Sequence, residues 1–308
     1  MALSDDPEMQ PFLFGLFLSM YLVTVLGNLL IILAVSFDSH LHTPMYFFLS
    51  NLSLDDICFI STTVPKVAVD IKIHRREIFY VNCLTQMSFL ILFGCMDAKL
   101  LTVMTYDWFE AICHPLYYSV IMNPHFFGFL VSTSFLVSLV DYKAHNLIAL
   151  QIIYFKDVEI SNFFCDPAQL LNLACSDTFI NNIVMYFVDV ISGFLPISGI
   201  FSYYKIVSSF LSVPSLGGRC KAFFTCGSYP SVVCLFYGTA IGVYLGSAVS
   251  HSPRKSAVAS LIYTVMTPML NPFIYSLRNR DIKSAVRKLH SRTVSFLGLW
   301  YSICNADW

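Results

Sequence analysis

Four long stretches of this chain contain no Asp, Glu, Lys or Arg, and this absence constrains the fold more than any other feature. The stretches are residues 9–37, 111–140, 222–253 and 256–277. Charged residues make up only 12% of the 308 residues, whereas an ordinary soluble domain contains roughly 25%. A helix needs about 20 mostly apolar residues to cross a bilayer. The sequence therefore predicts an integral membrane protein.

Three further apolar segments carry internal charges, which brings the predicted spans to seven. The apolar runs are continuous rather than alternating, which favours helices over membrane strands. No small-residue cleavage site follows the first span, so we expect it to be retained. We predict an all-α membrane protein, a single seven-transmembrane helix bundle occupying residues 1–308. The spans are expected near residues 12–35, 45–69, 83–112, 124–140, 179–204, 223–247 and 257–275, followed by a cytoplasmic tail, 276–308.

The tail is basic and carries Ile282, Val286 and Leu289 at helical spacing. This pattern predicts a short amphipathic C-terminal helix on an anionic inner leaflet, and a merely solvated basic tail is the alternative. With the N-terminus outside, nine Lys and Arg residues lie on the cytoplasmic side and eight on the outer side. The charge bias therefore decides the orientation only weakly. The basic residues of the tail are Arg278, Arg280, Lys283, Arg287, Lys288 and Arg292.

Several short motifs occur in one order along nearly the whole chain. Together they resemble the olfactory receptor branch of the rhodopsin-like G-protein-coupled receptors, and within it most closely family 7. Any one motif alone would be weak, whereas the set is specific. The motifs are Gly27-Asn28; residues 41–53 (LHTPMYFFLSNLS) followed by Asp56; residues 111–116 (AICHPL); Ser202-Tyr203; Lys221-Ala222-Phe223 with Thr225-Cys226; Phe236-Tyr237-Gly238; and residues 268–279 (PMLNPFIYSLRN).

The resemblance implies an odorant receptor that binds small volatile ligands within the helix bundle and signals through an olfactory-type stimulatory G protein. It also implies a multi-pass protein of the plasma membrane, in contact with membrane lipid, with the N-terminus outside and the C-terminus in the cytoplasm. No cofactor and no nucleic acid partner are expected. The resemblance places a ligand pocket between the third, fifth, sixth and seventh spans, and helix packing is the alternative for each of its residues: Leu90, Ile91, Gly94, Cys95, Tyr237, Ala240, Ile241, Tyr244 and Thr264.

The residues that the family uses for coupling and activation are matched here in part. Asn271-Pro272 places a proline inside an apolar helix, which removes a backbone hydrogen bond and permits a kink. Such a kink is either a packing feature, common in membrane helices, or a hinge about which Tyr275 moves on activation, and we favour the hinge. The full set implied by the resemblance is Asp107, Trp108, Tyr203, Asn271, Pro272 and Tyr275.

Asp56 and Asp97 are carboxylates inside predicted spans, where such groups are costly and usually face the bundle interior. By resemblance, Asp56, Asp97 and Asn271 line a small polar cavity that holds sodium, since hard oxygen ligands suit a hard cation. A water-filled hydrogen-bond network without an ion is the alternative. The resemblance also pairs Cys83 with Cys165 in a disulfide on the oxidising outer side. Beyond sodium, no metal site is expected.

The chain departs from the family at the inner end of the third span, where Asp107-Trp108-Phe109 replaces an Asp-Arg-Tyr motif. In the family, this arginine holds the resting state and meets the G protein on activation. Tryptophan has no charge and cannot form a forked pair with a carboxylate. We therefore expect G-protein coupling to be weak or absent.

Other departures add charges or a helix breaker where the family has neither. A charge near mid-bilayer costs about 2.5–3.5 kcal/mol, and one hypothesis is that Lys99 and Asp189 pair with each other. Pro230 interrupts the sixth span. The single Asn-x-Ser/Thr site, at Asn51, lies at the inner face, so retention in the endoplasmic reticulum is an alternative to surface delivery. The added charges are Asp55, Lys99, Glu110 and Asp189.

Three functions compete for this sequence. The first is the odorant receptor, in which a ligand shifts a helix bundle between two states. The second is a non-signalling product of a decaying olfactory receptor gene copy, which the several departures favour. The third is a membrane transporter or channel using Asp56, Asp97 and Lys99, but no inverted repeat or pair of broken helices supports it. An enzyme is not expected, because the sequence has no nucleophile–base set.

Overall fold

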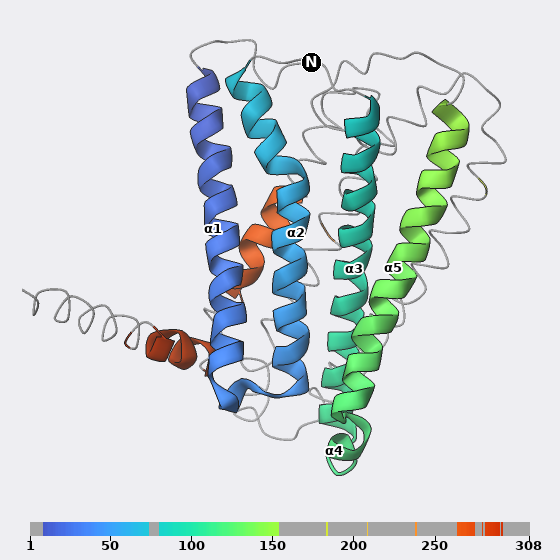
Figure 1. Ribbon diagram of the computed structural model, residues 1–308. Coiled ribbons are helices and arrows are strands. Elements are labelled where there is room, and N and C mark those ends of the chain that lie inside the picture. The colour runs from blue at the N-terminus through green and yellow to red at the C-terminus, as the bar shows by residue number, and fades with distance from the viewer. Residues whose placement is uncertain are drawn as a thin grey trace, which may run out of the picture.

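The structure is a computed structural model, and it describes residues 9–73, 80–153, 264–274 and 281–289 with the single residues 183, 208, 238, 279 and 291. Every element within these ranges is helical, as predicted. Figure 1 shows the long helices side by side, and short elements join them near one end of the bundle. The elements are α1 (Met9–Phe37), η1 (Ser39–Leu41), α2 (Pro44–Lys72), α3 (Tyr80–Cys113), α4 (Tyr118–Ile121), α5 (Pro124–Ile153) and the helices of residues 264–274 and 281–289.

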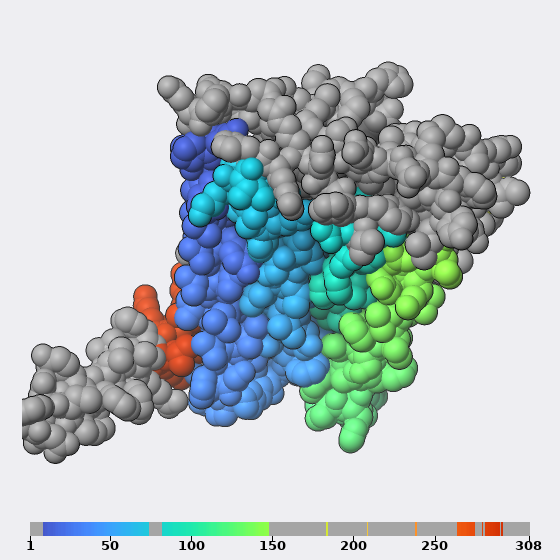
Figure 2. Space-filling view, turned by 45° about the horizontal axis from the view of Figure 1, so that its top comes forward, coloured from blue at the N-terminus to red at the C-terminus, as the bar shows by residue number. Residues whose placement is uncertain are grey.

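Neighbours in the sequence are neighbours in space: α1 packs against α2, α2 against α3 and α3 against α5. In the space-filling view of Figure 2, the atoms of α1 and α2 adjoin along the visible face. Within the described ranges, three helices are long and apolar enough to cross a membrane: α1, residues Asn82–Cys113 and residues Pro124–Leu147. They overlap the first, third and fourth predicted spans. The fifth and sixth spans lie outside the described residues.

The burial pattern of α1 is opposite to that of a helix in water. Thr24 and Asn28 are fully buried, while Leu22, Leu26 and Leu29 are exposed. A surface helix of a soluble protein turns its apolar stripe inward and its polar residues outward. The exposed leucines of α1 therefore form a face suited to lipid, while Thr24 and Asn28 point into the bundle.

The ends of the helices follow the local sequence. Pro44 stands in the first turn of α2, where a missing N–H is no loss because first-turn amides have no partner within the helix. Asn123 precedes α5, and its side-chain oxygen accepts a hydrogen bond from the backbone N–H of Phe126 at 3.0 Å. This contact caps α5. The helix then runs on to Ile153, beyond the apolar segment of residues 124–140 from which the fourth span was predicted.

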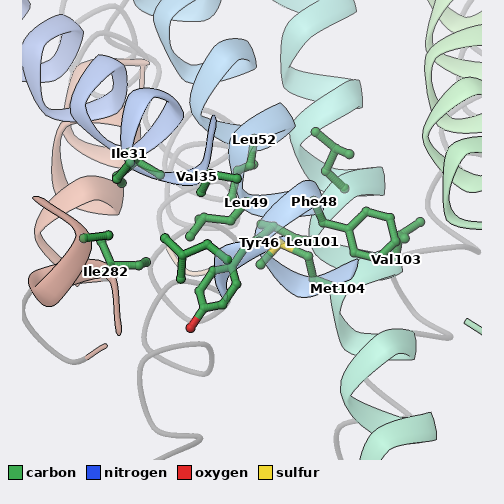
Figure 3. Packing of buried hydrophobic residues seen from close by; sticks show 14 of the residues in the cluster. Ile31, Val35, Tyr46, Phe48, Leu49, Leu52, Leu101, Val103, Met104 and Ile282 are labelled. Carbon is green, nitrogen blue, oxygen red and sulfur yellow. The ribbon is translucent and has the colours of Figure 1, made fainter. Parts of the chain in front are cut away.

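A hydrophobic core joins the helices at the end of the bundle that includes η1. Ile31 and Val35 of α1 meet Leu49 and Leu52 of α2 there, and Ile282 approaches from the C-terminal helix (Figure 3). Ile282 is fully buried. The last described helix is therefore part of the bundle's core and not an appendage of it. Other buried members of this core are Ala34, Leu41, Tyr46, Phe48, Met96, Leu100, Leu101, Val103, Met104, Met122 and Ala285.

The helix of residues 281–289 is amphipathic, as the sequence predicts. Asn279 caps it, because its side-chain oxygen accepts hydrogen bonds from the backbone N–H groups two and three residues further on, at 2.9 and 3.2 Å. Ile282 and Ala285 are buried, whereas Lys283 and Arg287 are exposed. The buried face thus includes a small residue, Ala285, that hydropathy spacing alone did not single out.

An ion pair links this helix to the first loop. Lys288 Nζ donates to Asp38 Oδ2 at 2.9 Å. The hydrogen bonds from Lys288 and from the backbone N–H of His40 lower the pKa of Asp38. Because the pKa is lowered in the folded protein, this contribution to stability is present at neutral pH and is lost as the pH falls through the folded value. Solvent screening keeps the contribution small.

Gly27 and Asn28 fit α1 against the helix of residues 264–274. Pro272 cannot donate a hydrogen bond to the carbonyl of Pro268, one turn earlier. Asn28 Nδ2 donates to that carbonyl instead, at 3.3 Å. A Cβ atom at residue 27 would lie 3.0 Å from Cβ and 3.3 Å from Cγ of Pro272. Glycine therefore allows the close approach, and asparagine supplies the donor that proline lacks.

Gly27→Val is expected to lower the free energy of unfolding by about 1–3 kcal/mol, because the added methyl groups overlap Pro272. The midpoint of thermal unfolding of the detergent-purified protein measures the effect. Gly15→Val is the matched control, since a Cβ at that position of α1 meets no atom within 4 Å. Equal midpoints for the two variants would contradict the close approach of the helices.

Candidate functional site

The inner end of α3 holds Asp107, the acidic residue of the altered coupling motif. Asp107 is buried, and Tyr118 of α4 donates a hydrogen bond from its hydroxyl to Asp107 Oδ1 at 2.8 Å. Burial and the neighbouring Asp107 carboxylate both raise the pKa of Tyr118, so the phenol keeps its proton at neutral pH. Trp108 follows on the same turn of α3 and is partly buried. A tyrosine of the following loop therefore holds the carboxylate of the motif.

Glu110 has a partner one turn further along. Its Oε2 lies 3.0 Å from Nδ1 of His114, and the His114 ring also contacts Phe109 edge-on. The Glu110 side chain is only 8% exposed, while that of His114 is 50% exposed. A charge that the sequence marked as out of place is therefore accommodated by a histidine at the edge of the bundle.

Asp56 and Asn271 form the centre of a buried polar cluster. Asn271 Nδ2 lies 3.0 Å from both carboxylate oxygens of Asp56, which links α2 to the helix of residues 264–274. Asp56 and Asp97 are both almost completely buried. Within the described part of the chain, both oxygens of Asp97 and the amide oxygens of Asn271 and Asn28 have no hydrogen-bond partner. The cluster therefore offers several buried oxygens that need a proton, a water molecule or a cation.

Asp55 belongs to this cluster, which the sequence did not indicate. Asp55 is buried next to Asp56, and its Oδ2, like both oxygens of Asp97, has no hydrogen-bond partner in the described part of the chain. The carboxylates of Asp55 and Asp97 are close enough for their charges to repel. The described residues include no group of three or more His, Cys, Asp or Glu side chains arranged to hold a metal ion. The unpartnered oxygens of Asp97 and Asn271 are hard donors, and their chemistry suits a monovalent cation.

Part of the predicted ligand pocket lies on α3. Leu90, Ile91 and Cys95 are partly buried there, and Thr264 is buried at the start of the helix of residues 264–274. A Cβ atom at Gly94 would lie 3.6 Å from the Phe59 ring, so Gly94 lies at the contact between α2 and α3. The pocket residues Tyr237, Ala240, Ile241 and Tyr244 lie outside the described residues.

Other predicted site residues are placed only in part. Cys83, near the start of α3, is disulfide-bonded, while the other cysteines of the described ranges, Cys58, Cys95 and Cys113, form no disulfide. The partner of Cys83 therefore lies outside those ranges, and its pairing with Cys165 stays a prediction. Pro272 is buried against Gly27. Two activation residues, Tyr203 and Tyr275, lie outside the described residues.

The buried charge of Lys99 has a partner that the sequence did not predict. Its Nζ lies 2.7 Å from Oδ2 of Asp141 on α5. The partner found among the described residues is Asp141, while Asp189, the partner in the sequence hypothesis, lies outside them. The predicted fourth span ended at residue 140, just before this aspartate, so Asp141 was not among the charges expected inside the bundle. An acidic residue inside a continuing helical pattern was the available signal.

Apolar helices with a lipid-facing surface and a buried polar centre define a helical membrane protein of the receptor type. A family model described as olfactory receptor matches residues 17–293. Olfactory receptor 7E178 of Mus musculus is 71% identical over 295 residues, which cover 96% of this chain and 89% of the relative. Olfactory receptor 7E24 of Homo sapiens is 69% identical, with 96% and 87% covered, and olfactory receptor 7D4 of Homo sapiens is 59% identical, with 96% and 95% covered.

The chain belongs to the olfactory receptor family. Membership confirms the predicted resemblance and gives the fold as a seven-transmembrane helix bundle. Membership makes the protein a multi-pass membrane protein of the plasma membrane in a family of signalling receptors, which are not enzymes. Odorants and G proteins are the partners of the family in general.

Proposed function

We propose that this chain binds a small volatile odorant inside the helix bundle and couples weakly, or not at all, to the olfactory-type stimulatory G protein. The observation that carries the proposal is the inner end of α3. Asp107 is held there by Tyr118 at 2.8 Å, and Trp108 occupies the position of the motif arginine. An uncharged indole cannot make the forked, charge-assisted hydrogen bonds of a guanidinium. An occupied ligand site would then shift the bundle with little effect on the G protein.

The proposed ligand site uses Leu90, Ile91, Cys95 and Thr264 together with the predicted residues of the fifth and sixth spans. A ligand moves a receptor only when it binds one of two conformations better than the other. Asn271-Pro272 is the proposed hinge between these conformations, since the proline frees a backbone carbonyl of its own helix. Asn28 donates a hydrogen bond to that carbonyl, so the proline does not leave this buried carbonyl without a donor.

The test is a cyclic-AMP assay with an odorant panel in cells that carry an N-terminal epitope tag on this chain. Staining of unpermeabilised cells reports surface delivery and an outer N-terminus, and forskolin confirms that the downstream cyclase responds. The expected result is surface staining without an odorant response. A strong response from the unmodified chain would overturn the proposal of impaired coupling. Staining only after permeabilisation would favour retention in the endoplasmic reticulum.

The second candidate is a non-signalling product of a decaying gene copy, and Trp108 is the observation that favours it. The same assay separates the two. A chain that binds odorants and responds once the arginine is restored has retained its receptor function. A chain that stays silent with arginine restored has lost more than the coupling residue.

We also propose that Asp56, Asp97 and Asn271 hold a sodium ion, which would supply the positive charge that this cluster of acids lacks. Replacing N-methylglucamine with sodium at constant ionic strength is expected to raise the thermal midpoint of the purified protein. Binding at tenfold above the dissociation constant adds about 1.4 kcal/mol to stability. Asp97→Asn should abolish the sodium effect. An unchanged sodium effect in that variant would leave the cluster as a hydrated network without an ion.

A further inference from the structure

A buried ion pair joins the middle of α3 to the middle of α5. Lys99 stands about halfway between Tyr80 and Cys113, and Asp141 about halfway between Pro124 and Ile153. Both residues lie in the segments that are long and apolar enough to cross a membrane. This contact is far from the inner end of α3 and does not depend on coupling to a G protein.

The geometry is that of a direct, desolvated pair. Lys99 Nζ lies 2.7 Å from Asp141 Oδ2, and the two side chains are 3% and 7% exposed. The backbone carbonyl of Cys95 is the other acceptor near Nζ, at 3.5 Å. His145 Nδ1 lies 2.8 Å from the backbone oxygen of Asp141. Among the described residues, the positive charge of Lys99 is thus balanced chiefly by the carboxylate of Asp141.

A second polar contact follows the same pair of helices. Ser88 Oγ donates to Asn146 Oδ1 at 2.6 Å. Polar side chains that bond across helices hold membrane helices together where no hydrophobic driving force acts between them. Two independent polar contacts between α3 and α5 identify this interface as one that depends on polar groups.

Either charge alone would be costly inside the bilayer, where ionised side chains persist mainly by pairing. Removing one member of a buried pair leaves the other uncompensated, which is strongly destabilising. Replacing both members with apolar residues of similar volume is often neutral or stabilising. The cost of each residue therefore depends on the presence of the other.

We infer that Lys99 and Asp141 are a co-dependent pair that holds α3 against α5, so that each charge is tolerated in the membrane only because the other is present. The inference goes beyond the proposed function, since it concerns folding of the bundle and holds whether or not the receptor signals. The cost of burying the Lys99 charge is then offset by Asp141, so Lys99 is not a defect of the fold.

The experiment is a double-mutant cycle read by thermal unfolding in detergent, which does not require the protein to reach the cell surface. A thiol-reactive dye follows the exposure of cysteines that form no disulfide, among them Cys58, Cys95 and Cys113. Lys99→Met and Asp141→Leu alone are each expected to lower the midpoint by about 6 °C or more. The double variant Lys99→Met/Asp141→Leu should return to within a few degrees of the unmodified chain.

Lys143→Met is the matched control, because it also removes a charge from α5 but at an exposed position. Its midpoint should not change. If a single variant gives no folded protein, the charge swap Lys99→Asp/Asp141→Lys tests the same dependence by rescue. Additive losses in the double variant, or failure of both the double variant and the swap to recover, would overturn the inference.

Discussion

Replacing Trp108 with arginine is expected to raise the odorant-dependent cyclic-AMP response about tenfold or more at equal surface staining. The new guanidinium would stand beside the buried Asp107 carboxylate, which accepts a hydrogen bond from the Tyr118 hydroxyl. Arginine can pair with a carboxylate at rest and release it on activation. Coupling free energies of about 1–3 kcal/mol correspond to changes of roughly 5- to 150-fold.

Trp108→Lys is the matched control for this gain, since lysine restores the charge without the forked geometry. A response restored by arginine and not by lysine would assign the loss to the missing fork. Equal gains in both variants would assign it to charge alone. A silent Trp108→Arg receptor with normal surface staining would contradict the expectation and place the fault elsewhere in the chain.

Asn271→Leu is expected to lower the free energy of unfolding by about 3 kcal/mol or more. The substitution keeps the volume of the side chain but removes both hydrogen bonds to the fully buried Asp56, each 3.0 Å long. A buried carboxylate without its donor suffers the full cost of desolvation. Thermal unfolding of the purified protein measures the loss.

The control for this prediction is the same substitution in an Asp56→Asn background. There the charge is already absent, so Asn271→Leu should cost only about 1 kcal/mol, the value of an ordinary hydrogen bond. The two costs together form a double-mutant cycle. If Asn271→Leu costs the same in both backgrounds, the amide does not stabilise the charge of Asp56.

The helical class of the described region could be predicted from local features of the sequence. The stretch without charges at residues 9–37 coincides with α1. A first-turn proline and an asparagine cap, which stand at the beginnings of α2 and α5, are signals of the same local kind. The spacing of Ile282, Val286 and Leu289 predicted the C-terminal helix. These features act within one or two turns of the chain, so they can be read without knowing the packing.

Contacts between helices were predicted less well, because they depend on how distant segments cross. The partner of Lys99 is 42 residues away on α5, and nothing in either segment alone pairs it with Asp141 in preference to Asp189. For Asp55 the sequence indicated only an added charge and no partner, although its carboxylate lies near that of Asp97. The family pattern did not help at either position, since both charges are departures from it.

The contacts found for the unusual charges alter the weight of the departures. Lys99 pairs with Asp141, Glu110 contacts His114, and Asp55 shares the polar cluster. In the sequence, each of these charges was a departure from the family pattern that was expected to destabilise the bundle. Trp108 is different, because an indole has no positive charge and cannot form the forked pair that a guanidinium makes with a carboxylate. The coupling motif is therefore the departure on which experiments should concentrate.

The close fit of α1 against Pro268 and Pro272 has a consequence for how the chain is made. The Asn28 side chain donates a hydrogen bond to the carbonyl of Pro268, which is synthesised 240 positions later. At about 5–20 residues per second, the ribosome needs roughly 12–48 s to reach it. During that interval the first helix lies in the membrane without the contacts that Asn28 makes with Pro268 and Gly27 makes with Pro272. Early quality control in the cell therefore acts on a first helix whose packing at Gly27 and Asn28 forms only after the last part of the chain has been made.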